Sequence, residues 1–206
     1  MNCTIWHEYQ SKWSKAQTND LITKYIVIEL GKCLVDFFRK GKKASERTKI
    51  VKKALVHLGD ECRLGKERFR VYANGLPKNL KLSDGTTFIN KEWLYDLHWY
   101  QDLKDSDYMP TNVPLVAEIE WRHKRADEKK VVPHSGIKFD FQKLLLANAQ
   151  LRLMIFLKRP KDKLSDFLEY FEKSIDNYKH LAPNSRFLFI AFDQKIKGFH
   201  YIERCK

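Results

Sequence analysis

Three acidic residues stand out because they interrupt segments that otherwise have the composition of β-strands. Asp96 lies within Glu92–Tyr100, whereas Glu118 and Glu120 lie within Pro114–Trp121. Aromatic and β-branched residues dominate both segments, and polar or turn residues bound them, which is typical of strands. Alternate residues of a strand project from the same face, so the side chains of Glu118 and Glu120 should point in one direction.

Two neighbouring carboxylates on an apolar strand are costly to bury unless a cation neutralises them. Asp96, on a neighbouring strand, can complete such a cluster. We therefore predict that Asp96, Glu118 and Glu120 bind a hard divalent cation, Mg²⁺ or Mn²⁺, through their carboxylate oxygens. The alternative is that they are solvated residues of an edge strand, where acidic side chains are usually found. The apolar run Leu115–Ala117 before the pair is typical of a central strand and favours the cation site.

The charge of the chain indicates what kind of molecule it binds. Its 206 residues include 39 Lys and Arg against 26 Asp and Glu, which gives a formal net charge of +13. So large an excess of positive charge favours a polyanionic partner, and nucleic acid is the first candidate. A basic surface that only keeps the protein soluble is the alternative.

The sequence also argues against several other classes of protein. The four cysteines are scattered without a Cys-x-x-Cys pair, which disfavours a zinc ribbon and a disulfide framework, so we expect reduced thiols. No apolar run is long enough to span a membrane, and the N-terminal residues lack the pattern of a signal peptide, so the expected location is the cytoplasm. There is no phosphate-binding glycine loop and no Gly-x-Ser-x-Gly elbow, which leaves NTPase and α/β-hydrolase functions without support.

Apolar residues at helical spacing predict helices in the first part of the chain. Two helices are expected between residues 4 and 40, and Asp20 should cap the second. Their apolar residues are Ile5, Trp6, Tyr9 and Trp13, then Leu21, Tyr25, Ile28, Leu30 and Leu34. A third helix should begin near Ser45 and direct an apolar stripe inward as far as Glu61. This carboxylate is either a salt-bridged core residue or a possible additional acidic ligand.

Strands and helices are expected to alternate in the rest of the chain. Apolar patterns predict strands at residues 68–73, 92–100, 114–121, 151–157, 186–192 and 199–202, with one helix from Asp140 and another over residues 163–178. This order predicts an α/β (α+β) fold in which helices flank a mixed central sheet. An N-terminal helical extension, residues 1–43, is expected to pack on a main domain formed by residues 44–206.

The order of these elements, with carboxylates on the second and third strands, resembles the PD-(D/E)XK nuclease superfamily. That family places an acidic residue on strand two and a (D/E)-x-K pair on strand three of a restriction-endonuclease-like core, which is often described as αβββαβ. Asp96 matches the first position and Glu118 the second. Glu120 stands where the family usually has lysine, and this variation resembles that of the BamHI-type restriction endonucleases.

The resemblance extends over roughly residues 92–158. It rests on Glu118-Ile-Glu-Trp121, on Lys124, and on Asp140-Phe-Gln-Lys-Leu144 at the start of a helix that leads into an apolar strand. It implies a metal-dependent DNA endonuclease that hydrolyses phosphodiester bonds with Mg²⁺ or Mn²⁺ as cofactor. The implied catalytic and metal-binding residues are Asp96, Glu118 and Glu120.

The absent lysine of the motif raises the question of which cation assists the attacking water. A glutamate at position 120 cannot act as a cation, but it can take a proton or bind a second metal. Lys143 lies on the following helix, away from the apolar stripe, and can supply the positive charge as a fourth catalytic residue. The alternative is that Lys143 is an ordinary solvated lysine of a helix.

The loop after the Glu118 strand should contact the DNA backbone. Its basic residues are Arg122, Lys124, Arg125, Lys129 and Lys130. We expect His123 and His134, in the same loop, to contact phosphates or water rather than a metal, because the seven histidines show no zinc spacing.

We expect the protein to bind DNA and not a membrane. It can act as a homodimer or as part of a larger defence or recombination complex. The alternative function is that of a non-catalytic nucleic-acid-binding or partner-binding protein with a degenerate nuclease fold.

Binding to duplex DNA should weaken steeply with salt, because each neutralised phosphate releases counterions. If six or more phosphates are contacted, we expect the affinity to fall by orders of magnitude between about 50 and 200 mM salt. Fluorescence anisotropy with a labelled duplex measures this dependence. An affinity that does not change with salt would contradict a phosphate-binding surface.

Overall fold

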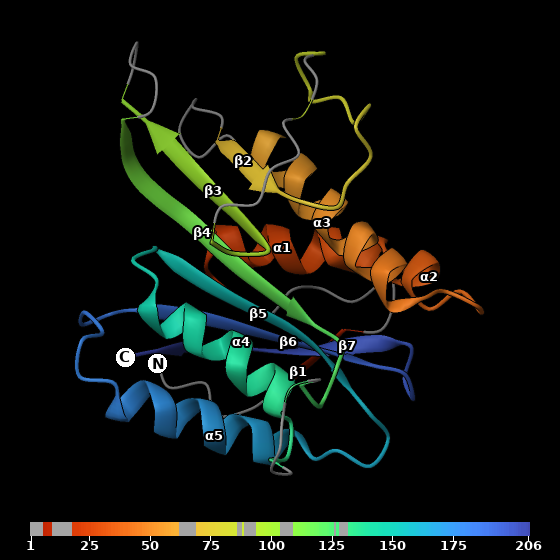
Figure 1. The fold of residues 1–206 in the computed structure, drawn as a ribbon, viewed down its shortest axis with the longest axis vertical. Helices are drawn as coiled ribbons and strands as arrows, with labels where there is room; N and C mark the ends of the chain where they lie inside the picture. Colours follow the sequence, from red (N-terminus) through yellow and green to blue (C-terminus); the bar gives the residue numbers. More distant parts are fainter. Residues whose placement is uncertain are drawn as a thin grey trace. The chain divides into compact units, whose positions relative to one another are not determined.

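The computed structural model describes residues 6–9, 18–61, 69–85, 88, 94–103, 109–125, 127 and 132–206. It shows a mixed α/β fold in which helices flank a seven-stranded mixed sheet with the strand order β1-β7-β6-β5-β4-β3-β2 (Figure 1). The chain divides into two compact units, one formed by Met1–Gln10 with Ala117–Lys206 and the other by Ser11–Val116. The division falls inside strand β4 (Pro110–Glu120).

The unit Ser11–Val116 is built from three helices and a pair of antiparallel strands. Its elements, besides the first part of β4, are α1 (Leu21–Lys32), α2 (Leu34–Phe37), α3 (Ala44–Glu61), β2 (Arg70–Ala73) and β3 (Leu97–Asp102). As predicted, Asp20 caps α1, because its carboxylate accepts a hydrogen bond from the Thr23 amide at 2.8 Å. The strands β2 and β3 pair with Val71 opposite Trp99.

Trp99 joins the helical and the sheet parts of this unit. Its indole is fully buried and donates a hydrogen bond to the Leu55 carbonyl of α3 at 3.1 Å. Its ring stacks on Phe69 with 5.6 Å between the ring centroids. Gly59 makes the close approach of α3 possible, because a Cβ there would lie 2.5 Å from the indole nitrogen.

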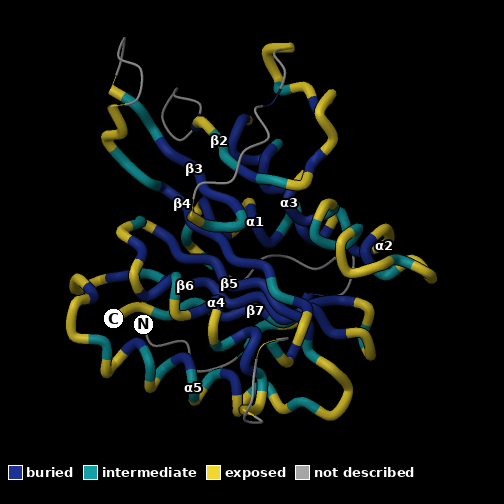
Figure 2. The backbone as a smooth tube through the Cα atoms, in the orientation of Figure 1, coloured by how far each residue is buried: buried dark blue, intermediate teal, exposed yellow. Residues whose placement is uncertain are grey.

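The second unit holds most of the sheet. Its elements, besides the end of β4, are β1 (His7–Tyr9), α4 (Ser135–Leu146), β5 (Leu151–Lys158), α5 (Leu164–Asn177), β6 (Arg186–Asp193) and β7 (Gly198–Cys205). The strands β5 and β6 are parallel and are connected through α5, whereas β7 is antiparallel to both β6 and β1. Buried residues follow β5 and β6 almost without interruption, whereas β7 is buried mainly in its first half (Figure 2).

An aromatic cluster holds α4 and α5 on one face of β5 and β6. The ring centroids of Phe141 in α4 and Phe171 in α5 lie 4.7 Å apart. The Phe171 ring in turn stacks on Phe189 of β6, with 4.2 Å between the centroids. Phe167 of α5 lies 4.8 Å from Phe156 of β5. These four elements therefore form one apolar layer. It fixes the position of α4, and with it the position of the polar side chains that α4 carries.

The helix predicted across Trp6 and Tyr9 is wrong, because His7–Tyr9 forms the strand β1. Tyr9 stacks on Phe199 of β7 at 5.1 Å, and backbone pairing with β7 decides the conformation despite the helical spacing of the aromatic residues. Ile5 and Trp13, the other members of that pattern, lie outside the described residues.

The predicted inner faces of two helices also need correction. In α1, Leu21 and Tyr25 are 53% and 45% exposed, whereas Ile22 and Ile26 are buried, so the helix is rotated relative to the prediction. Glu61 is exposed at the end of α3, so it is not the inward carboxylate that the stripe predicted. The buried carboxylate is that of the preceding residue, Asp60, which accepts a hydrogen bond from the Ser83 amide.

Cys33 and Cys205 are free thiols, and burial raises the pKa of the Cys33 thiol to about 11. None of the helices in the described part of the chain has the length and apolarity that a membrane crossing needs.

His98 on β3 should make the stability of the protein depend on pH. It is 1% exposed, and burial lowers the pKa of its imidazole from 6.5 to about 4. An unfolded chain takes up this proton near pH 6.5, so protonation favours the unfolded state as the pH falls. The contribution of neutral His98 to stability is therefore complete above pH 6.5 and is lost as the pH falls towards 4.

We expect His98→Phe to lose less stability than the wild type between about pH 7 and about pH 4.5. The phenyl ring can still stack on Tyr72, whose ring lies 5.1 Å from that of His98, but it cannot bind a proton. Urea unfolding of both proteins at several pH values, without divalent metal, measures the difference. Equal losses in the two proteins would contradict this account.

Candidate functional site

Glu118 is a buried carboxylate inside an apolar strand. The preceding residues of β4, from Leu115 to Ala117, are buried, and Glu118 itself is 1% exposed. Lys143 of α4 places its ammonium nitrogen 3.1 Å from one carboxylate oxygen of Glu118. A buried carboxylate requires such a cation because charge is costly to remove from water.

Lys143 is held between two carboxylates rather than being a solvated helix lysine. Its ammonium lies 2.8 Å from Asp140, one helical turn earlier, as well as contacting Glu118. Burial alone would lower the pKa of Lys143, but the hydrogen bond to Asp140 and the charge of Glu118 outweigh it and raise the pKa above its ordinary value. Lys143 is therefore a permanent cation near neutral pH.

Glu120 follows on the same side of β4. Its carboxylate accepts hydrogen bonds from the backbone amide of Arg122 at 2.6 Å and from the Arg122 guanidinium at 3.4 Å. A Cβ on Gly136 of α4 would lie 3.4 Å from the γ carbon of Glu120. Glu118 and Glu120 thus both face α4, in agreement with the alternation expected of a strand.

Gly136 lets the first turn of α4 lie directly against the chain that leaves β4. A Cβ at this position would lie 2.4 Å from the carbonyl oxygen of Arg122, closer than any side chain can approach. Glycine is therefore required here for its lack of a side chain. The resulting contact fixes α4 where Lys143 can reach Glu118.

Asp96 belongs to the other unit and does not lie on a strand. It is the last residue of a bend, and β3 begins one residue later at Leu97, so the predicted strand starts too early. The Asp96 carboxylate lies 2.9 Å from the ammonium of Lys52 on α3, a side chain that is 3% exposed. Lys52 also donates a hydrogen bond to the side chain of Asn74 at 2.6 Å.

Asp96 and the two glutamates belong to different units, and their convergence stays a prediction. Glu61, the possible additional ligand, lies at the exposed end of α3 in the same unit as Asp96.

The residues predicted to bind DNA differ in their surroundings. Lys124 and Arg122 are exposed, and Arg122 is paired with Glu120 as described. Arg125 forms hydrogen bonds of 2.9 and 2.5 Å with Asp127, and its guanidinium carbon lies 3.7 Å from the centre of the Phe139 ring. Lys129 and Lys130 lie outside the described residues. Contact of these side chains with DNA stays a prediction.

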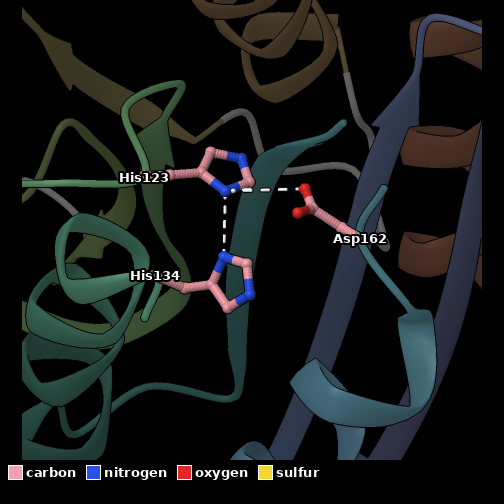
Figure 3. Close-up of side chains that lie close together, drawn as sticks. All are labelled: His123, His134 and Asp162. Atoms are coloured by element: carbon pink, nitrogen blue, oxygen red, sulfur yellow. Dashed lines mark hydrogen bonds and ion pairs between the residues drawn. The ribbon is translucent and has the colours of Figure 1, made fainter. Parts of the chain in front are cut away.

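A second cluster of polar side chains was not predicted. Among the described residues, His123, His134 and Asp162 bring three potential metal-ligating atoms within 4.8 Å of one another. Figure 3 shows the two imidazoles and the carboxylate converging from three turns. His123 follows β4, His134 precedes α4, and Asp162 lies between β5 and α5.

The two imidazoles in this cluster contact each other through their Nδ1 atoms at 2.9 Å. Burial lowers the pKa of both His123 and His134, so both rings are neutral at neutral pH. The sequence carried little sign of this arrangement, because the three residues are far apart in the chain and fit no short zinc motif. The only hint of the cluster in the sequence is that both histidines flank the basic loop that follows Glu120.

The chain matches no family model, no curated protein and no solved structure in comparisons with known proteins.

We expect Gly136→Ala to destabilise the protein by about 1–3 kcal/mol, because the added methyl group must displace α4 from the Arg122 carbonyl. Urea unfolding measures the change, and Gln142→Ala, an exposed position on the same helix, is the matched control. If Gly136→Ala were as stable as the control, the close contact between α4 and the end of β4 would be refuted.

Proposed function

We propose that the chain is a metal-dependent nuclease with a restriction-endonuclease-like core that hydrolyses phosphodiester bonds in DNA. The observation that carries the proposal is the contact between Lys143 and Glu118 at 3.1 Å. In the (D/E)-x-K pattern the strand itself supplies the carboxylate and the lysine. Here the strand supplies Glu118 and Glu120, and a lysine from the following helix reaches the first of them.

The donor atoms at the end of β4 suit the proposed cofactor. Glu118 and Glu120 both offer carboxylate oxygens on the face towards α4, and oxygen ligands are preferred by Mg²⁺ and Mn²⁺. In the proposal Asp96 supplies a third carboxylate. An ammonium group beside a carboxylate also favours the ionised form, which is the form that can bind a cation.

The proposed residues divide the work of hydrolysis between them. A bound divalent cation would supply polarisation of the phosphoryl oxygen and a lower pKa for the attacking water. Glu118 and Asp96 anchor that cation, and Glu120 either shares it or accepts the proton of the water. The ammonium of Lys143 stabilises the negative charge that develops on the phosphate, which is the role of the missing motif lysine.

The surface next to Lys143 supports a nucleic-acid partner. Phe139 of α4 is 41% exposed, and the centre of its ring lies 3.7 Å from the Arg125 guanidinium carbon and 5.7 Å from the Lys143 ammonium nitrogen. A hollow of about 490 Å³ lies beside this ring, with Arg125, Lys138 and Tyr170 in its lining. Aromatic rings stack on bases and cations hold phosphates, so this combination suits a nucleic acid.

One observation favours the alternative of a non-catalytic nucleic-acid-binding protein. The Asp96 carboxylate already has a cation at 2.9 Å, the nearly fully buried ammonium of Lys52. If this pair is permanent, Asp96 is a structural residue and the metal site is degenerate.

Cleavage of plasmid DNA by purified variants tests the proposal. We expect Glu118→Ala to abolish cleavage and leave DNA binding intact or stronger, because the metal acts mainly on the transition state whereas basic side chains provide ground-state affinity. Lys143→Met should slow cleavage less, by about 100-fold. Glu169→Gln and Lys173→Met, at an exposed ion pair of α5, are matched controls that should cut as the wild type does.

Two results together would overturn the nuclease proposal: the wild-type chain cuts no DNA with Mg²⁺ or Mn²⁺, and Glu118→Ala binds these metals as the wild type does. Retained binding of DNA in that case would establish the non-catalytic alternative. Calorimetry with each metal and anisotropy with duplex DNA provide the two binding measurements.

A further inference from the structure

The cluster of His123, His134 and Asp162 is chemically different from the carboxylates of β4. Two imidazole nitrogens and one carboxylate oxygen meet at the ends of three separate turns (Figure 3). None of the three is among the catalytic or metal-binding residues proposed for the nuclease.

The hydrogen bond on the far side of His123 fixes which of its nitrogen atoms carries the proton. Its Nε2 atom lies 2.6 Å from the carbonyl oxygen of Leu157, and a carbonyl can only accept. Nε2 is therefore protonated, and in the neutral ring the lone pair is on Nδ1. That lone pair faces Nδ1 of His134 at 2.9 Å and a carboxylate oxygen of Asp162 at 3.5 Å.

These separations are close to those of ligands around a tetrahedral ion. Bonds of about 2.0–2.1 Å to Zn²⁺ place neighbouring ligand atoms about 3.3 Å apart. The two distances from His123 Nδ1, 2.9 and 3.5 Å, lie on either side of that value. The ligand atoms of His134 and Asp162 also lie within 4.8 Å of each other, so side-chain shifts of up to about 1.5 Å would bring all three atoms to the spacing that the ion needs.

Contacts around the cluster also orient its members as ligands. The Leu157 carbonyl holds the His123 ring from behind, which is the usual arrangement for a metal-binding histidine. The same Asp162 oxygen that faces His123 accepts a hydrogen bond from the Arg159 amide at 2.7 Å, which fixes the direction of the carboxylate. His134 is held by a left-handed backbone with φ of 57° at the start of α4, and its ring lies 4.4 Å from that of Phe167.

We propose that His123, His134 and Asp162 are the protein ligands of a divalent transition-metal ion, and that this ion is Zn²⁺. Two nitrogens and one oxygen suit this class of ion, whereas Mg²⁺ prefers a set of oxygens. Three protein ligands leave a fourth position for water. The ion would tie together the turn after β4, the start of α4 and the turn between β5 and α5. This proposal does not depend on nuclease activity.

The competing account is a hydrogen bond between two neutral histidines with no metal. Titration of the full chain with Zn²⁺ and with Co²⁺ distinguishes the two. We expect one Zn²⁺ per chain at this site and the visible absorption of tetrahedral Co²⁺, unchanged by an excess of Mg²⁺. We also expect the melting temperature to rise by about 5–10 °C at a free Zn²⁺ concentration about 100 times the Kd.

Two variants assign the binding to this cluster. His134→Asn removes the imidazole and keeps a residue that tolerates the left-handed backbone, and Asp162→Asn can still accept the hydrogen bond of the Arg159 amide. Each should weaken Zn²⁺ binding by more than about 100-fold and remove the thermal shift. His180→Asn, at an exposed position, and Glu118→Ala should bind Zn²⁺ as the wild type does.

Absence of a stoichiometric Zn²⁺ complex of the wild type would overturn the proposal, and so would equal affinity in folded variants. Because the wild-type titration is decisive by itself, failure of a variant to fold, as seen by circular dichroism, does not leave the question open. Loss of Zn²⁺ binding in Glu118→Ala would move the site to the carboxylates and would likewise refute it.

Discussion

The burial of one negative charge in β4 determines much of what surrounds it. Glu118 is 1% exposed within an apolar strand, and an isolated carboxylate in such a place is too costly to leave ionised. Lys143 removes that cost with an ammonium 3.1 Å away, but only if α4 lies close to β4. Gly136 permits this approach, and beside it Glu120 folds back onto the amide of Arg122. The position of α4 and the glycine in its first turn are thus both needed to keep this buried charge paired.

Each of the two units contains a lysine–carboxylate pair of this kind. In both pairs the lysine comes from a helix and the carboxylate lies in or next to a strand, with distances of 2.9 Å for Lys52 and Asp96 and 3.1 Å for Lys143 and Glu118. A divalent cation at either carboxylate has to share it with an ammonium group.

Sequence patterns predicted the elements whose apolar residues repeat regularly and whose partners lie nearby. The predicted bounds of β5, β6 and α5 differ by at most one residue from those observed. The strand β1 was missed because its conformation depends on β7, far away in the sequence. The apolar neighbours of Glu118 predicted that it is buried. For Lys143 the sequence left two alternatives open, a catalytic cation or a solvated lysine of a helix. The histidine cluster could not be predicted, because its members meet only when three turns are folded.

The pairing of β1 with β7 has a consequence for the order in which the protein can fold. His7 of β1 lies opposite Tyr201 of β7. Because β1 precedes β7 by almost 200 residues in this sequence, β1 cannot pair until β7 has been synthesised. Residues 11–116, which form the other unit, come between them and can reach a compact state earlier. Until β7 is made, the residues of β1 have no partner strand, so this edge of the sheet can form only at the end of folding.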